Sequence, residues 1–537
     1  MPKNYLIALG GTGSRCLEAV VYLSAAGLFR DPLHVLIIDP DQNNGNSVRT
    51  RQIITAYHAL HLAQQPQRPQ VRRAMGLIAS SLPEPTLFQA GINRQAGGGN
   101  AQQSIFWHNP NNAQRKFSEI IEYQAQPENL RHFLDLFYEA DDLDMELDVG
   151  YRGRTNVGAV ALKQDLEGTV TIADSGLREF LANLNIDLQA GEARVFIMGS
   201  VFGGTGAAGV PTVPSLIKTL PAEVIAQDNR SRLRYGCAMM TPYFSFPQST
   251  KQDGGPGTDS SRHAVATQAA LIHYAHVPPG YQHVYFIGAP NRSQTNTNNV
   301  KGGQNQVNDP HYAELVAALA ALDFFSTDSI PPQTRQLHFA DTVRQGRDVG
   351  VSWESLPVHP DFAIRREEIK RKLVAFTTFA FFYKNFLYHG FANRHAYKET
   401  NWYRNNFGQL TLDDQGPLLR NCYDFSTSYL SWLQRIGTTG QQANLELFDF
   451  NALLADERDL CAQYVGNLAR GMESRPKFMN EGYDRILEKI DAIKLKQPGT
   501  NSAMGLFVYL LYQAVIAFCR ENYSWQNAEI GAGAGRA

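Results

Sequence analysis

The stretch Val201-Phe202-Gly203-Gly204-Thr205-Gly206-Ala207-Ala208-Gly209-Val210-Pro211 follows the apolar run from Val195 to Met198 and contains four glycines. Glycine loses more conformational freedom on folding than any other residue, so such a cluster needs a structural reason. One reason is anion binding, because residues without side chains let backbone N–H groups converge on a ligand. A helix starting at Pro211 would add its positive dipole end. A tight strand-to-helix turn without a ligand is the alternative, and this stretch alone leaves both open.

The beginning of the chain predicts a strand, a turn, a helix and a second strand. The apolar run Tyr5–Leu9 leads into the glycine-rich turn Gly10–Arg15, and helical periodicity follows from Cys16 to Ala26. The apolar run from His34 to Asp39 predicts the second strand. A strand–helix–strand unit of this length predicts a parallel sheet, whose ligands bind beyond the carboxyl ends of the strands. The fold class that we predict is α/β, with a Rossmann-like parallel sheet.

The remaining pattern predicts two regions. Apolar strands recur at 233–240 and 284–288, and Asp309 is placed to cap a helix over Pro310–Phe325. Beyond about residue 345, aromatic-rich helical stretches dominate. We therefore expect a first domain over 1–345, with an insertion at about 101–190, and a mainly helical C-terminal domain over 346–537.

Composition narrows the classes of protein. The 537 residues are 43% hydrophobic and 19% charged, which is typical of globular proteins. The net charge of −2 gives no basic field, so we predict no nucleic-acid partner. Five scattered cysteines without a CxxC pair, and no signal-peptide pattern at the N-terminus, favour a reducing, cytoplasmic location. The apolar stretch 504–519 is shorter than the roughly 20 residues of a membrane span, so we expect a buried helix there.

Common nucleotide and hydrolase motifs are missing. The first glycine turn has Cys16 where a dinucleotide fingerprint has its third glycine, and no Gly-Lys-Ser/Thr follows it. The chain also contains no HExxH or GxSxG motif.

The glycine loops, taken together and in order, resemble those of the tubulin/FtsZ superfamily, in its divergent prokaryotic tubulin-like branch. Gly203–Gly206 matches the GGTG core of that family's hallmark loop, although Phe202 and Ala207-Ala208 depart from it. The other matching pieces are Gly10–Ser14, Asp39–Gln42, Ala96–Asn100, Thr241–Phe246 and Pro290–Arg292. The resemblance implies a parallel sheet that binds GTP or GDP with Mg²⁺ between loops at its carboxyl edge.

The same resemblance assigns roles to residues. The phosphate-binding positions would be Gly10, Gly11, Thr12, Gly13, Ser14, Gly97, Gly98, Gly99, Asn100, Gly203, Gly204, Thr205 and Gly206. Asp41, or Asp39 in its place, would orient the magnesium ion through water, although Asp39 could instead cap a strand end. The residues toward the ribose and base would be Arg262, Asn291, Asn308, Asp309, His311 and Tyr312. Asp309 could equally be a plain helix cap, so guanine rather than adenine rests on the family alone.

Hydrolysis and assembly are the last expectations from the resemblance. Gln336–Asp341 resembles the acidic loop that, in FtsZ polymers, reaches the nucleotide of the neighbouring subunit. Asp341 would orient water and His338 would act as a base, but an ordinary surface loop is the alternative. We therefore predict a GTP-binding protein that self-assembles and hydrolyses GTP between subunits. A nucleotide-bound scaffold that recruits proteins through the helical C-terminal region, and a nicotinamide-cofactor enzyme, are the alternatives.

Overall fold

The structure is a computed structural model, and it describes most of the sheet-forming part of the chain. The described residues are 2–29, 31–41, 43–64, 92–93, 106–107, 115–172, 175–245, 260–276, 279–289, 293–294, 303–333, 335–340, 343–344, 347–348, 351–353, 356, 363–388, 396–406, 416–439, 445–450, 453, 468–470, 482–493, 503–523 and 525. Contacts divide the chain into two compact units. The first comprises Met1–Val20, Asp31–Gln52 and Ile92–Asp348, and the second comprises Val21–Arg30, Ile53–Gly91 and Val349–Ala537.

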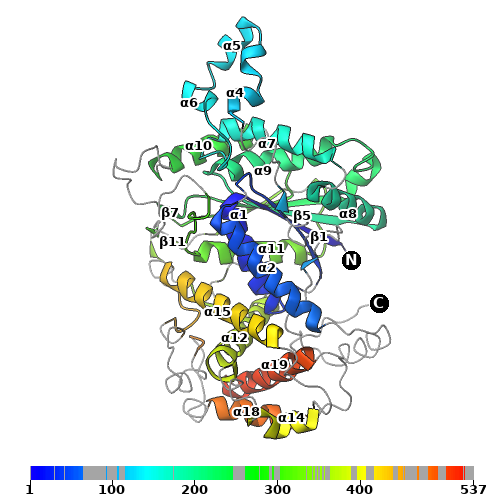
Figure 1. The fold of residues 1–537 in the computed structure, drawn as a ribbon, viewed down its shortest axis with the longest axis vertical. Helices are drawn as coiled ribbons and strands as arrows, with labels where there is room; N and C mark the ends of the chain where they lie inside the picture. Colours follow the sequence, from blue (N-terminus) through cyan, green and yellow to red (C-terminus); the bar gives the residue numbers. More distant parts are fainter. Residues whose placement is uncertain are drawn as a thin grey trace. The chain divides into compact units, whose positions relative to one another are not determined.

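A parallel sheet forms the centre of the first unit (Figure 1). Its order is β10-β8-β6-β5-β1-β2-β3, and β4 also pairs with β2. The strands are β1 (Lys3–Leu9), β2 (Leu33–Ile38), β3 (Ile92–Asn93), β4 (Phe106–Trp107), β5 (Ala193–Ser200), β6 (Leu233–Met240), β8 (His283–Ile287) and β10 (Gln336–Ala340). The α/β class with a Rossmann-like parallel sheet is confirmed. Because the order reverses between β1 and β5, the loops after these two strands part and leave a crevice, where such sheets bind ligands.

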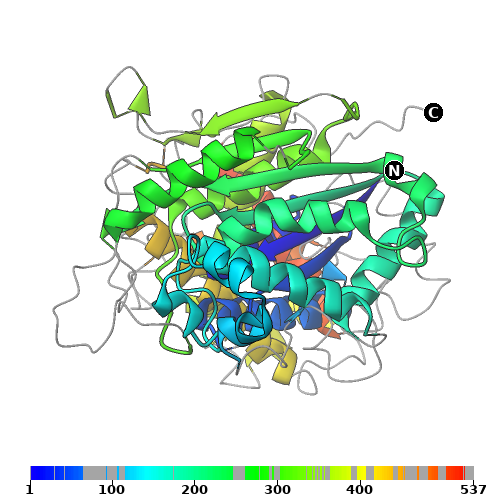
Figure 2. The same cartoon turned by 90° about the horizontal axis from the view of Figure 1, so that it is seen from above.

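Helices cover both faces of the sheet (Figures 1 and 2). One face carries α7 (Thr155–Val170), α8 (Gly176–Ala190), α9 (Gly204–Thr219) and α10 (Ser260–His276). The opposite face carries α1 (Gly10–Ala25) and α11 (Tyr312–Ser326). Helices α7 and α8 fall within the segment 101–190, so much of this segment belongs to the layered core.

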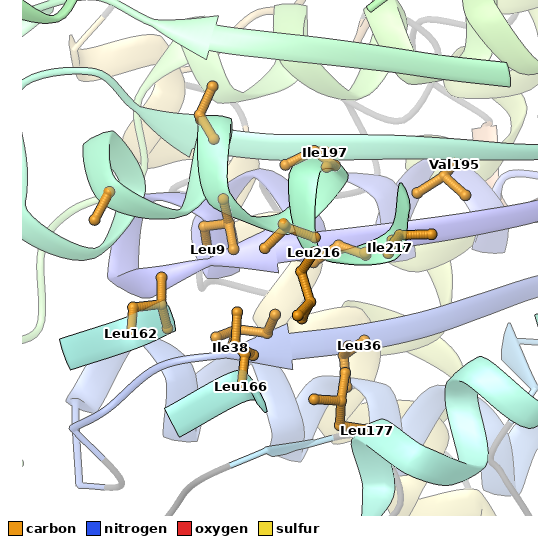
Figure 3. Packing of buried hydrophobic residues seen from close by; sticks show 14 of the residues in the cluster. Leu9, Leu36, Ile38, Leu162, Leu166, Leu177, Val195, Ile197, Leu216 and Ile217 are labelled. Carbon is orange, nitrogen blue, oxygen red and sulfur yellow. The ribbon is translucent and has the colours of Figure 1, made fainter. Parts of the chain in front are cut away.

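The alternation of side chains along the strands explains the two layers. Leu9 of β1, Ile38 of β2 and Ile197 of β5 are buried and point toward Leu162 and Leu216 in α7 and α9 (Figure 3). Side chains at the intervening positions face the other layer.

On that other face, Phe196 packs against Phe324 of α11 with ring centroids 5.4 Å apart. A Cβ atom on Gly236 would lie 2.7 Å from the same Phe324 ring, so glycine in β6 permits α11 to approach the sheet closely.

The first unit carries several smaller elements. Four short helices between β4 and α7 project beyond α7 in Figure 1. The smaller elements are α4 (Phe117–Ile120), η1 (Tyr123–Ala125), α5 (Glu128–Leu134), α6 (Ala140–Leu143), η2 (Gln227–Arg232), β7 (Phe244–Ser245), β9 (Ser293–Gln294), β11 (Val343–Arg344) and β12 (Arg347–Asp348). Helix α2 (Gly45–Gln64), like α1, contributes residues to both units.

The second unit is mainly helical in its described part, as the sequence predicts. Its elements are α12 (Ala363–Phe382), the π-helical η5 (Tyr383–Leu387), η6 (Ala396–Glu399), α14 (Asn401–Asn406), α15 (Gly416–Thr439), α18 (Gly482–Ala492) and α19 (Ala503–Asn522). The apolar stretch 504–519 lies in α19, where Leu511, Val515 and Phe518 are fully buried. Among the described residues, no helix has both the length and the apolar character that a membrane span needs.

Candidate functional site

The first glycine cluster begins helix α1 instead of forming a separate turn before it. The helix starts at Gly10, which adopts a left-handed φ of +64° that favours glycine. A Cβ atom on Gly13 would lie 2.6 Å from the carbonyl oxygen of Met198. Glycine therefore permits the first turn of α1 to pack directly against the backbone of the neighbouring strand β5. The expected helix start at Cys16 is wrong by six residues for this reason.

The second glycine cluster has the same construction. Helix α9 begins at Gly204, not at Pro211, and Gly203 is its extended N-terminal cap. A Cβ atom on Gly206 would lie 2.4 Å from the carbonyl oxygen of Ser200, at the end of β5. The close approach of the helix to the strand end requires glycine here, and tertiary contact overrides its low helix propensity.

The two helix N-termini meet at one cavity. A Cβ atom on Gly10 would lie 3.1 Å from Cβ of Thr205, so the first turns of α1 and α9 are in contact. Neither helix carries an acidic residue in its first turn, so no side chain of the turn neutralises its positive dipole end. The residues that line the cavity are Leu9, Gly10, Gly11, Thr12, Arg15, Asp39, Asp41, Asn44, Asn46, Val149, Gly150, Tyr151, Arg152, Gly153, Ser200, Phe202, Gly203, Gly204, Thr205, Gly206, Phe244, His263, Gln306 and Asn308.

A third loop, residues 149–153, lines the cavity and was not predicted. Gly150 and Gly153 have φ near +79° and +78°, and Arg152 between them has a left-handed φ of +45°. A Cβ atom on Gly204 would lie 2.8 Å from Cβ of Tyr151, so this loop packs on the first residue of α9. Gly150 and Gly153, shortly before the helix at Thr155, indicate a turn in the sequence. The interpretation of 101–190 as an insertion gave this turn no role in the site.

Two carboxylates form the acidic part of the cavity wall. Asp39 directly follows β2, and its Oδ2 accepts a 2.6 Å hydrogen bond from the Ser47 hydroxyl. Burial raises the pKa of Asp39 to about 7, and the hydrogen bond from Ser47 partly offsets this effect. Asp41 accepts hydrogen bonds from the backbone N–H groups of Gly303 (2.7 Å) and Asn43 (3.1 Å), and burial raises its pKa.

Amide side chains form the neighbouring part of the wall. Asn44 Nδ2 donates a 2.8 Å hydrogen bond to Gln306, and the backbone N–H of Asn308 donates one of 2.8 Å to Asn46 Oδ1. These bonds tie the segment 303–308 to the loop after β2. Asn308 is only 4% exposed, and its side-chain oxygen has no hydrogen-bond partner in the described part of the chain. A buried acceptor without a partner is costly, so this oxygen lacks a donor that a ligand can supply.

A buried ion pair lies beside this wall. Arg15 Nε donates a 2.6 Å hydrogen bond to Glu314 of α11, and its Nη2 donates one of 2.6 Å to the Tyr243 hydroxyl. The side chains of Arg15 and Glu314 are 2% and 0% exposed. Glu314 also accepts from the backbone N–H of His311, so its charge is fully engaged within the protein.

Aromatic rings complete the wall at the side of Arg15. Its guanidinium lies 5.3 Å from the ring centroid of Phe244, and Phe202 lies 4.8 Å from the ring of His263. Phe202 and Phe244 are buried and meet edge to face, so they form an apolar part of the wall.

The structure brings many of the predicted site residues together. Those that line the cavity are Gly10, Gly11, Thr12, Asp39, Asp41, Gly203, Gly204, Thr205, Gly206 and Asn308. Gly13 and Ser14 are buried beneath it, where the Ser14 hydroxyl lies 2.9 Å from that of Ser47. Gly97, Gly98, Gly99, Asn100, Asn291 and Asp341 lie outside the described residues. For Arg262 the structure describes only a backbone position in α10.

Other predicted residues lie elsewhere. Asp309, His311 and Tyr312 are not among the described residues that line the cavity. Asp309 also does not cap α11, because the helix begins at Tyr312 and the His311 ring accepts from the N–H of Ala313 at 3.1 Å. His338 is not in a loop but in the edge strand β10, where its ring stacks on Tyr285 at 4.3 Å.

The described residues contain neither a cluster of metal ligands nor a disulfide. No group of three or more His, Cys, Asp or Glu side chains that could hold a metal occurs among them. The four described cysteines, Cys16, Cys237, Cys422 and Cys519, are free and buried. The Asp39–Asp41 pair is therefore the acidic feature of this cavity.

Comparison of the chain with models of known protein families, with curated proteins and with solved structures finds no match. The resemblance to the tubulin/FtsZ superfamily stays a prediction from the sequence.

Proposed function

We propose that this chain binds a nucleoside triphosphate in the cavity at the ends of β1 and β5. The sequence resemblance favours GTP as this nucleotide. The observation that carries the proposal is the contact between Gly10 and Thr205, which joins the N-termini of α1 and α9 at one cavity. Unpaired N–H groups and the positive ends of two helix dipoles are a suitable environment for phosphate groups. The hydroxyl of Thr205 is placed to donate to a phosphate oxygen.

The Asp39–Asp41 pair fits a magnesium ion that accompanies the phosphates. Mg²⁺ keeps several waters and takes one or two carboxylates plus phosphate oxygens, so it does not require a cage of three protein ligands. Asp41 would orient the hydrated ion, and Asp39 would accept from its waters. When bound, the ion would neutralise charge on the phosphates.

The amide and aromatic parts of the wall offer contacts for the base of the ligand. The unpartnered oxygen of Asn308 is an acceptor, and both guanine and adenine carry N–H donors. Phe244 and Phe202 offer rings for stacking. Glu314, beside the cavity, is not available to guanine, because Arg15, Tyr243 and His311 already engage it. GTP rather than ATP therefore still rests on the sequence resemblance.

Self-assembly with hydrolysis between subunits is the fuller form of the proposal. In this form of the proposal a group from another copy activates water, and His338 lies in β10, not among the described residues that line the cavity of its own chain. The same observation supports the second candidate, a nucleotide-bound scaffold with little turnover. That scaffold would recruit other proteins through the helical second unit.

Calorimetric titration with GTP, GDP and ATP, each with and without Mg²⁺, tests binding. We expect Thr205→Val to weaken GTP binding about fivefold, the effect of one lost hydrogen bond of about 1 kcal/mol. Thr212→Val is the matched control, because Thr212 lies in the same helix and bonds the carbonyl of Ala208 instead. The absence of binding of every nucleotide to the unmodified protein would overturn the proposal.

Turnover separates the two forms. GTP hydrolysis per subunit is measured as protein concentration rises, with light scattering recorded alongside. A steep rise of both supports hydrolysis completed between subunits. Binding with flat, near-zero turnover supports the scaffold.

A further inference from the structure

Two of the described residues that line the cavity are arginines, and they differ in how far the protein compensates their charge. Arg15 is buried and engaged by Glu314 and Tyr243, so most of its charge is compensated within the protein. The side chain of Arg152 is 33% exposed, and its partner is Asp148, whose side chain is 47% exposed. An exposed ion pair of this kind contributes little free energy, so a stronger anion can displace Asp148.

The position of Arg152 is fixed by its loop. Tyr151 and Gly153 pack on Gly204, at the N-terminus of α9. On the other side, a Cβ atom on Gly150 would lie 4.0 Å from Cβ of Asp41. The loop therefore joins the phosphate-type end of the cavity to the acidic residue proposed for magnesium. The wall that carries Asn308 is not part of this loop.

The backbone of Arg152 supports a specific use of its side chain. A left-handed conformation is unfavourable for a residue with a side chain, and glycine would adopt it freely. Strain of this kind persists where the surrounding structure enforces it, as at binding sites. Arg152 therefore lines the cavity in this conformation although its neighbours Gly150 and Gly153 are glycines, and its guanidinium is held only by the exposed Asp148.

We propose that Arg152 binds the terminal phosphate and makes the cavity select nucleoside triphosphates over diphosphates. This inference rests on the proposed nucleotide-binding function. The negative charge of a triphosphate grows toward its end, where Asp39 and Asp41 add further negative charge. Helix dipoles contribute only partial charges, and Arg15 is engaged by Glu314. Arg152 supplies a full positive charge, and guanidinium matches the geometry of phosphate oxygens in two parallel hydrogen bonds.

The test is the ratio of two affinities. Titration calorimetry with Mg²⁺ gives the Kd of GDP and of a non-hydrolysable GTP analogue for the full chain and for Arg152→Ala. We expect the Kd of the triphosphate to rise about tenfold or more and that of the diphosphate to change less than about threefold. Arg152→Lys keeps the charge but not the paired hydrogen bonds, so it should restore only part of the preference.

Two further variants sharpen the result. Asp148→Ala removes the resting partner of Arg152 and should tighten triphosphate binding without affecting GDP. Arg420→Ala is the matched control, because Arg420 makes the same i,i+4 bond of 3.0 Å to Asp424 in α15 of the second unit. It should leave both Kd values unchanged.

The outcomes distinguish the inference from the function on which it rests. If the unmodified chain binds neither nucleotide, the proposed function fails. If it binds both and Arg152→Ala weakens both equally, or neither, the function stands and the role of Arg152 is refuted. Loss of the triphosphate preference alone supports the inference, with circular dichroism showing that the variant is folded.

Discussion

Cβ of Tyr151 lies 2.8 Å from the place where a side chain on Gly204 would begin. The same Cβ position on Gly204 would lie 3.2 Å from the backbone nitrogen of Gly153. The space beside the first residue of α9 is therefore taken by the 149–153 loop and not by a ligand. Any side chain at Gly204 has to displace that loop before it reaches a bound phosphate.

Gly204→Arg should therefore abolish nucleotide binding and also reduce stability, whereas a purely ligand-filled site would leave stability unchanged. Overpacking of this kind costs about 1–3 kcal/mol. Chemical denaturation measures the free energy of unfolding, and titration measures binding. Gly168→Ala in α7 is the control, because no atom lies within 4 Å of the new Cβ. It should stabilise the helix by roughly 0.5–1 kcal/mol. Full stability of Gly204→Arg would contradict the packing argument.

Glu314→Ala should be among the most destabilising substitutions in the first unit. It leaves the buried guanidinium of Arg15 without its carboxylate, and breaking a buried pair costs about 3–5 kcal/mol. Asp424→Ala removes the carboxylate of an exposed pair with Arg420 and should cost about 0–1 kcal/mol. Urea unfolding of both variants decides the matter, and equal losses would show that the Arg15–Glu314 pair is not the strong contact described.

The sequence allows part of this site to be predicted. Apolar runs followed by glycines give the parallel strands and place Gly10–Thr12 and Gly203–Gly206 at one sheet edge. The pattern cannot reveal that both clusters lie inside helices, because glycine is a poor helix former and only the nearby strand backbone explains its presence. It also cannot pair Arg15 with Glu314, which are 299 residues apart. Two glycines shortly before Thr155 mark a turn at 149–153, but the place of this loop at the cavity follows only from the contact between Tyr151 and Gly204.

His311 makes stability depend on pH. Burial, and then the charge of Arg15, lower the pKa of its imidazole to about 3, whereas an unfolded histidine titrates near 6.5. Between these values the unfolded chain binds the additional proton, so stability is complete above about pH 6.5 and is lost as the pH falls toward 3. His311→Asn keeps a helix cap but cannot titrate. Its urea midpoint should fall less between pH 7.5 and 5 than that of the unmodified chain. His132→Asn on the exposed α5 is the control, and identical slopes for all three proteins would reject the prediction.

Asn308→Ala should weaken nucleotide binding without lowering stability, whereas Gly204→Arg should lower both. The fold uses the backbone of Asn308, whose N–H donates to Asn46 and whose carbonyl accepts from Arg49 at 3.1 Å. Its side-chain oxygen is buried without a partner in the described part of the chain, so removing it ends a desolvation cost. Stability should therefore stay the same or rise. Nucleotide affinity should fall about five- to tenfold, because the ligand loses an acceptor in a water-poor wall. Thermal unfolding and calorimetric titration of the same sample measure both quantities. Unchanged affinity would show that the unpartnered oxygen does not meet the ligand, and a large loss of stability would show that it has a structural role.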